Sequence, residues 1–232
     1  MTTVMEILEA VGAFLVGLVA RLGVTLVLGL VLLVPAVIIG VSIHLVRRHR
    51  AAAVPRVDGI ELRHGAWHAP NHTWLASCGP GELEVGLDDL GQRILPSVTA
   101  VELPRPGMSV HRGDPIAVLR AGQRIVRLGA PVDGTVLRVN GRVRWDPGLV
   151  KREPYGGGWL FRLEPADRGY LELPRDAAAE GWMRSERQRL ERFVEQELGF
   201  AAADGGALVV PVPGALGEDG WKRLVSAFLH AA

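Results

Sequence analysis

Lysine is almost missing from this sequence. Among the 232 residues, which include 26 lysines and arginines, lysine occurs only at Lys151 and Lys222. The chain therefore has few primary amines for amide-linked prosthetic groups or for Schiff-base chemistry. Cysteine is represented by Cys78 alone, which excludes an intramolecular disulfide and a multi-cysteine zinc site and fits a reducing compartment. A formal net charge of +1 gives no overall field that favours nucleic acid, so we expect no nucleic-acid partner.

Recognisable catalytic arrangements are missing as well. The sequence has no serine and histidine paired in a nucleophile context and no glycine-rich phosphate loop, and Gly156-Gly157-Gly158 is interpreted as a turn before Trp159. Asp88-Asp89 is a pair of carboxylates, but on a short helix we expect it to cap the helix and to face solvent. We therefore expect no catalytic residue and no enzyme activity.

Three regularly spaced histidines form the one pattern that could indicate a metal site. His64, His68 and His72 are spaced by four, which would align three ligands on one face of a helix. Gly65 and Pro70 argue against such a helix. Surface or strand positions are therefore favoured for the histidines, and no metal site is expected.

A long apolar run lies within the first 50 residues. Residues 22–46 contain no acidic, lysine or arginine side chain, and a helix of this length can cross about 30 Å of hydrocarbon. Arg47-Arg48-His49-Arg50 follows the run, so the positive-inside tendency places the rest of the chain on the cytoplasmic side. The sequence thus predicts a single-pass protein of the inner or plasma membrane, with residues 22–46 in the lipid bilayer and the C-terminal domain in the cytoplasm.

Residues 4–20 are also apolar, and their arrangement stays open. Arg21 follows them, and an arginine is costly at the centre of a bilayer. We favour a short helix that lies on or dips into the outer leaflet, or that packs against the helices of a partner. A second full crossing is the alternative, and it would reverse the position of the N-terminus.

The chain divides into four segments. Residues 1–50 are the membrane segment, and residues 51–70, which show little periodicity, are interpreted as a linker. Residues 71–175 are predicted to form a globular domain. Residues 176–232 are predicted to form a C-terminal helical extension.

Two amphipathic helices are expected in that extension. Residues 176–198 carry apolar side chains on roughly one face, and a last helix is expected to begin at Glu218 or Asp219. The apolar stripe of this last helix consists of Trp221, Leu224, Val225, Phe228 and Leu229. The stripe either packs on the globular domain or docks on another protein, and the sequence leaves both open.

The globular domain is organised around residues 113–140, which have the pattern of a β-hairpin followed by a third strand. Residues 116–119 and 125–128 are rich in apolar and β-branched side chains, and Ala121-Gly122 between them can turn. Residues 130–134 mark a second turn before the third strand.

Several motifs around this hairpin, taken in their order, resemble the glycine cleavage system H proteins of the biotinyl/lipoyl-domain superfamily. The matching residues are His72-Thr73-Trp74, residues 84–91, 101–104 and 106–107, Asp146-Pro147 and residues 153–160. The resemblance implies a mainly β (α+β) fold, a lipoyl-type barrel-sandwich hybrid. The membrane helix and the C-terminal helices would be additions to it.

One position departs from the family in a way that matters chemically. The family hairpin reads roughly AVVESVKAVSDLYAPVSG, and residues 117–134 align with it without a gap. Gln123 stands where the family has the lysine that carries the lipoyl group, so the resemblance implies that no cofactor is attached here. Acidic positions of the family align with Arg120 and Arg127, and Arg124 adjoins Gln123. The tip of the hairpin has therefore become basic.

Three functions are compatible with these observations. The favoured one is a membrane-anchored, non-lipoylated structural or interaction module at the cytoplasmic face, for example in a membrane complex, with a protein partner. The alternatives are an H-type lipoyl carrier of glycine cleavage and a small-molecule-binding domain. The candidate interaction residues are Arg120, Gln123, Arg124, Arg127, Trp221 and Phe228. For the three arginines, a role in keeping the tip soluble is the competing interpretation.

Overall fold

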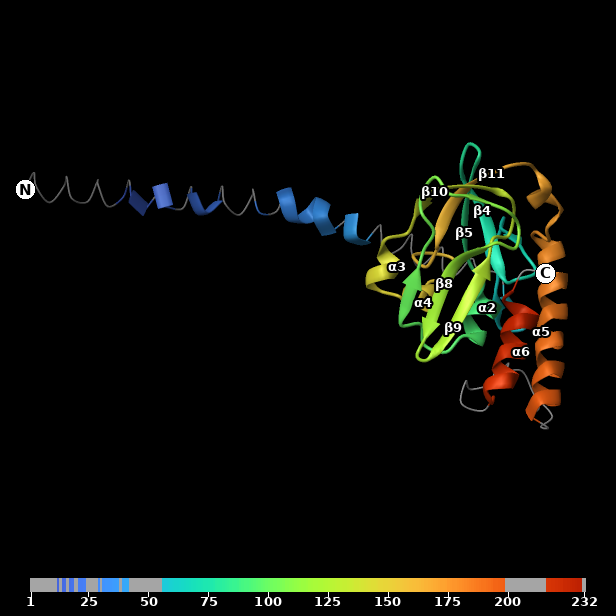
Figure 1. The fold of residues 1–232 in the computed structure, drawn as a ribbon. Coiled ribbons are helices and arrows are strands. Elements are labelled where there is room, and N and C mark those ends of the chain that lie inside the picture. The colour runs from blue at the N-terminus through green and yellow to red at the C-terminus, as the bar shows by residue number, and fades with distance from the viewer. Residues whose placement is uncertain are drawn as a thin grey trace, which may run out of the picture. The chain divides into compact units, whose positions relative to one another are not determined.

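The structure is a computed structural model with two compact units, Met1–Ala53 and Val54–Ala232 (Figure 1). In the second unit it describes residues 56–198 and 216–230. In the first unit it describes residues 12, 14–15, 17–18, 21–23, 29, 31–37 and 39–41. Each unit is considered by itself.

The described residues of the first unit are helical and exposed, and residues 31–37 are the longest continuous stretch. The predicted crossing at residues 22–46 falls largely outside the described residues, as does most of residues 4–20. Among the residues that are described, no helix has the length and apolar character needed to cross a membrane. The membrane crossing therefore stays a prediction.

The second unit begins with a small hairpin, which corrects the predicted linker at residues 51–70. Strands β1 (Arg56–Val57) and β2 (Ile60–Glu61) pair antiparallel around Asp58 and Gly59. These two residues have φ angles of 49° and 83°, and a type I′ turn requires two positive φ angles. Because Val57 and Ile60 are buried in the core, residues from 56 onward belong to the folded unit.

Two antiparallel sheets form the centre of the second unit (Figure 1). The six-stranded sheet has the order β3-β4-β5-β11-β10-β7, and the three-stranded sheet has the order β6-β8-β9. The bounds of the first sheet are β3 Trp67–His68, β4 Thr73–Gly79, β5 Glu82–Leu87, β11 Phe161–Pro165, β10 Gly134–Val139 and β7 Ser109–Val110. Those of the second are β6 Ala100–Glu102, β8 Pro115–Ala121 and β9 Arg124–Gly129. The predicted hairpin and third strand are β8, β9 and β10.

One hydrophobic core joins side chains from both sheets and from the helices. Beside it, Trp74 in β4 is fully buried, and its indole Nε1 donates to the carbonyl oxygens of Leu87 at 3.1 Å and Pro154 at 3.0 Å. Gly86 lies against the ring, where a Cβ atom would come within 2.7 Å of the indole. A larger residue at this position would displace Trp74, so the two positions are coupled.

Short helices connect the strands. They are α2 (Asp89–Ile94), α3 (Arg142–Trp145), α4 (Leu149–Arg152) and the 3₁₀ helix η1 (Gly169–Glu172). Asp88 caps α2, because its carboxylate accepts a hydrogen bond of 2.7 Å from the Gly91 amide. The predicted cap is confirmed. The expectation that this carboxylate faces solvent is wrong, since Asp88 is completely buried.

The two predicted C-terminal helices are α5 (Ala177–Leu198) and α6 (Glu218–Phe228). Figure 1 shows them side by side next to the sheets. They are joined by an edge-to-face contact between Phe193 and Phe228 and by an ion pair of 2.5 Å between Arg223 and Glu197. The mainly β fold with added helices is thus confirmed for this unit.

Candidate functional site

The hairpin of β8 and β9 ends in a two-residue turn that displays Gln123. Ala121 pairs with Arg124 across the ladder, which leaves Gly122 and Gln123 as the turn. Gly122 has a φ of +65°, and a type II′ turn places glycine at this first central position. Gln123 is exposed, so its carboxamide lies at the tip of the hairpin.

Two of the three tip arginines are exposed. Arg120 forms an ion pair of 2.6 Å with Glu102 on β6, and both side chains are about half exposed. Arg127 has no ion pair among the described residues of the second unit. Of the basic side chains on the hairpin, Arg127 is therefore the one available to an acidic partner.

Arg124 instead joins the hairpin to α6. Its guanidinium group lies over the ring of Trp221, 4.5 Å from the ring centroid. Its Nη2 donates to the carbonyl oxygen of Leu216 at 3.2 Å, and its Nη1 is buried without a hydrogen-bond partner. This contact was not predicted, because nothing in the local sequence indicates which helix covers the hairpin.

A groove of about 620 Å³ lies between β9 and α6, beside the tip. It is lined from the hairpin by Gln123, Arg124, Ile125 and Arg127, from α6 by Glu218, Trp221, Lys222 and Val225, and by His230 after α6. Lys222 is paired with Glu218 at 2.8 Å, so the two arginines give the groove its positive charge. The apolar floor and basic rim suit an acidic, amphipathic surface.

Trp221 and Phe228, predicted as interaction candidates, are buried at 5% and 1% exposure. Both belong to the hydrophobic core. Of the two arrangements left open for the α6 stripe, packing on the domain is the one in the structure. The tip and the groove therefore remain as the exposed candidate site. Trp221 is connected to this site through its contact with the guanidinium group of Arg124.

The two lysines occupy different environments. Lys151 belongs to α4, and its side chain reaches the end of α2. There its Nζ donates to the carbonyl oxygens of Gln92, at 2.6 Å, and of Leu95. It thereby satisfies carbonyl groups that the helix end leaves free, and burial lowers the pKa of Lys151. Lys222 is 64% exposed on α6. Neither lies on the hairpin.

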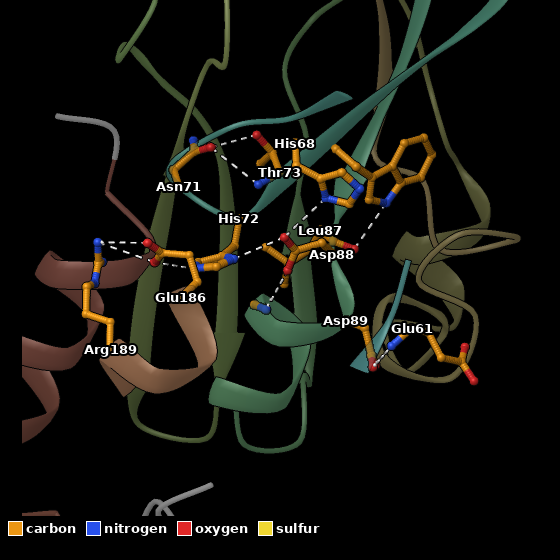
Figure 2. Close-up of polar contacts among 12 residues, drawn as sticks. Glu61, His68, Asn71, His72, Thr73, Leu87, Asp88, Asp89, Glu186 and Arg189 are labelled. Carbon is orange, nitrogen blue, oxygen red and sulfur yellow. Dashed lines mark hydrogen bonds and ion pairs between the residues drawn. The ribbon is translucent and has the colours of Figure 1, made fainter. Parts of the chain in front are cut away.

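A second polar group, missed in the sequence, is buried between the sheets and α5 (Figure 2). The Nδ1 atom of His72 lies 3.0 Å from a carboxylate oxygen of Asp88, and that of His68 lies 3.6 Å from the same oxygen. On the other side, Nε2 of His72 lies 3.5 Å from Glu186 of α5, which pairs with Arg189. We call His68, His72, Asp88 and Glu186 the buried charge cluster, and Arg189 is its exposed neighbour.

Electrostatics in the buried charge cluster favours the charged forms of His72 and Asp88. Burial lowers the pKa of His72, but the charge and hydrogen bond of Asp88, with Glu186, outweigh it and raise this pKa to about 9. Burial raises the pKa of Asp88, but His72 and His68 outweigh it and hold this pKa well below its usual range. Glu186 belongs to α5, Asp88 caps α2, and His68 belongs to β3 of the six-stranded sheet. The cluster therefore links α5 to α2 and to this sheet.

The three regularly spaced histidines do not converge. His64 is exposed and lies 3.1 Å from Asp176, whereas His68 and His72 are completely buried. Among the described residues, no group of three histidine, cysteine or acidic side chains is placed to hold a metal ion. The expectation of surface or strand positions holds for His64, which is exposed, and for His68, which lies in β3, but it is wrong for His72, which is buried just before β4.

Comparison with the sequences of known proteins places this chain in a family. A family model described as "Glycine cleavage H-protein" matches residues 67–185. The chain belongs to this family. It is 38% identical over 114 residues to the glycine cleavage system H protein of Micrococcus luteus, which covers 49% of this chain and 89% of that protein. It is 35% identical over 112 residues to the protein of the same name from Escherichia coli, over 48% and 87% of the two chains.

Among solved structures, the glycine cleavage system H protein of Mycobacterium marinum matches 53% of this chain and 99% of its own length. That match has 24% sequence identity and a TM-score of 0.47. The matched residues 67–185 contain the hairpin but end within α5. The first unit, the β1–β2 hairpin and α6 lie outside the matched residues.

The tip does not fit the lipoyl group that the family resemblance implies. An amide-linked lipoyl group needs a primary amine at the turn, and the turn offers Gly122 and the carboxamide of Gln123. The basic side chains of the hairpin itself are arginines, which cannot replace the amine. This chain thus has an H-protein domain without a lysine on the hairpin to which a lipoyl group could be attached.

Proposed function

We propose that this chain is a non-lipoylated member of the H-protein family that works as a membrane-tethered interaction module. The observation that carries the proposal is the turn Gly122-Gln123, which displays a carboxamide where the family attaches its lipoyl group. Without the arm, the domain has no means to carry a reaction intermediate. What remains is its shape and its exposed tip, and we assign it no catalytic role and no cofactor.

The membrane tether is proposed from the sequence of residues 22–46, which are free of acidic, lysine and arginine side chains. The basic residues 47–50 favour a cytoplasmic position for the second unit. We propose that the chain is a single-pass subunit of a complex in the inner or plasma membrane. Its folded unit would hold a protein partner at the cytoplasmic face.

The proposed docking surface consists of Gln123, Arg127 and the groove beside α6. Arg127 is exposed and has no ion pair among the described residues, so its charge can be used by a partner. Ile125 is 42% exposed beside it and offers apolar area. An acidic segment with an apolar side chain would satisfy both.

We expect Arg127→Glu to reduce the amount of the co-purified partner roughly tenfold, because it reverses an exposed charge of the tip that has no ion pair among the described residues. The melting temperature should stay unchanged, since an exposed, unpaired side chain contributes little to folding. The measurement is quantitative mass spectrometry of the complex recovered in mild detergent. Arg124→Glu is unsuitable for this test, because it would also break the contact with Trp221.

Arg168→Glu serves as the matched control, because Arg168 is an exposed arginine that lies away from the tip, at the start of η1. It makes the same change of charge on the same domain. Equal partner recovery for both variants, at the level of the unchanged chain, would remove the tip from the proposal.

A lipoyl carrier is the second candidate function, and one observation favours it. Lys222 lines the same groove as Gln123 and is 64% exposed. It is the exposed one of the two lysines, and it lies beside the position where the family has its lysine. Modification of Lys222 would therefore restore a carrier role from α6 instead of the hairpin.

A further inference from the structure

Trp145, the last residue of α3, is 92% exposed. Tryptophan offers a large apolar surface and usually covers most of it in folded proteins. The remaining large aromatic residues that the structure describes in the second unit are buried or half-buried. Such a side chain on the surface indicates a contact with something outside the chain.

The orientation of α3 is fixed by Val143, which is completely buried in the core. With Val143 turned inward, the residues on either side of it, Arg142 and Arg144, are exposed together with Trp145. Arg142 and Trp145 are three positions apart and therefore lie on the same side of the helix. The side chains of this helix thus form one outward-facing surface, the α3 surface, consisting of Arg142, Arg144 and Trp145.

The charge of the α3 surface is uncompensated within the described part of the second unit. Arg142 and Arg144 have no ion pair there. Asp146, the next residue along the chain, is already paired with Arg152 at 2.5 Å. Arg138, on the strand that leads into α3, is also exposed and without an ion pair among these residues. The α3 surface is therefore basic, with an indole at its end.

We propose that the α3 surface contacts the anionic lipid headgroups of the membrane to which the chain is tethered. Indole rings prefer the boundary between hydrocarbon and headgroups, where the apolar ring and the N–H group are both accommodated. Arginines close to an anionic leaflet are attracted to it over about one Debye length. Both preferences are met by one face of one short helix.

The membrane is favoured over an acidic protein because of the length of the tether. This step rests on the proposed function, which places residues 22–46 in the bilayer. Residues 47–55 separate that run from β1, and they can reach about 30 Å at most when fully extended. A folded unit held so close to a bilayer meets the headgroups at a high effective concentration.

The test uses the full chain in vesicles of phosphatidylcholine and phosphatidylglycerol, with or without bromine atoms on the acyl chains. Bromine quenches the emission of a tryptophan that reaches the boundary of the hydrocarbon. We expect brominated lipid to quench the emission of the unchanged chain, and we expect Trp145→Ala to lose more than half of that quenching. Arg142→Glu with Arg144→Glu should lose it to the same extent, as should phosphatidylcholine alone.

Equal quenching in the unchanged chain and in Trp145→Ala overturns the inference. So does shielding of Trp145 from acrylamide by a co-purified protein without quenching by brominated lipid, because the surface would then bind a protein.

Extraction with alkaline carbonate tests the tether separately. A chain that resists extraction but shows no quenching of Trp145 contradicts the α3 surface alone. A chain that is extracted contradicts the tether, and quenching of its Trp145 by added anionic vesicles would still support the α3 surface.

Discussion

Replacing Asp88 by alanine is expected to lower the free energy of unfolding by about 3–5 kcal/mol. The change leaves the charge of His72 buried without its nearest partner, which lies 3.0 Å away in the unchanged chain. It also removes the cap of α2, because the Gly91 amide loses its acceptor. Unfolding in urea, followed by tryptophan emission, measures the loss.

The matched control for Asp88→Ala is Asp146→Ala. Asp146 also pairs with a cation, Arg152, but both side chains are at least half exposed. Water replaces such a pair at little cost, so the midpoint of unfolding should hardly move. If the two variants had similar midpoints, the buried charge cluster would not hold the fold together as described.

The stability of the second unit is expected to fall as the pH rises from about 6.5 to about 9. The folded state raises the pKa of His72 from 6.5 to about 9, so the protonated form is stabilised by folding. This contribution is fully present below the unfolded pKa and is lost as the pH passes the folded pKa. The expected loss is roughly 2–3 kcal/mol, measured as the free energy of unfolding at a series of pH values.

The groups that face His72 identify the variants for this measurement. They are Asp88 and His68 from the sheet side and Glu186, with Arg189 behind it, from α5. His72→Asn should flatten the pH dependence, and asparagine tolerates the φ of 57° at this position. Glu186→Gln should weaken it, whereas His64→Gln, at an exposed histidine, should leave it unchanged. A profile that is unchanged in His72→Asn would contradict the assignment.

Local patterns were sufficient to predict the hairpin and the C-terminal helices. Strands β8 and β9 alternate between buried and exposed positions, and α6 repeats its apolar residues at helical spacing. The β1–β2 hairpin was missed although Asp58-Gly59 is a strong turn signal, because its strands have only two residues each. Short strands of this kind carry no periodicity.

The buried charge cluster could not be predicted, because its members come from distant parts of the chain. His72 and Asp88 are separated by 16 positions, and Glu186 comes from a helix outside the sheets. Each side chain alone resembles an ordinary surface residue, and burial becomes visible only in the packed structure. The contacts of Arg124 with Trp221 and Leu216 are hidden for the same reason, since 92 positions separate Arg124 from Leu216, which precedes α6 and accepts its hydrogen bond.

The most direct test of the central proposal is the intact mass of the chain, isolated in mild detergent from the membranes of its own host. We predict the unmodified mass of the 25.0 kDa chain, together with a membrane protein in a fixed ratio. A mass increased by one lipoyl group would contradict the proposal. If peptide mapping placed that group on Lys222, the carrier function would have moved from the hairpin to α6.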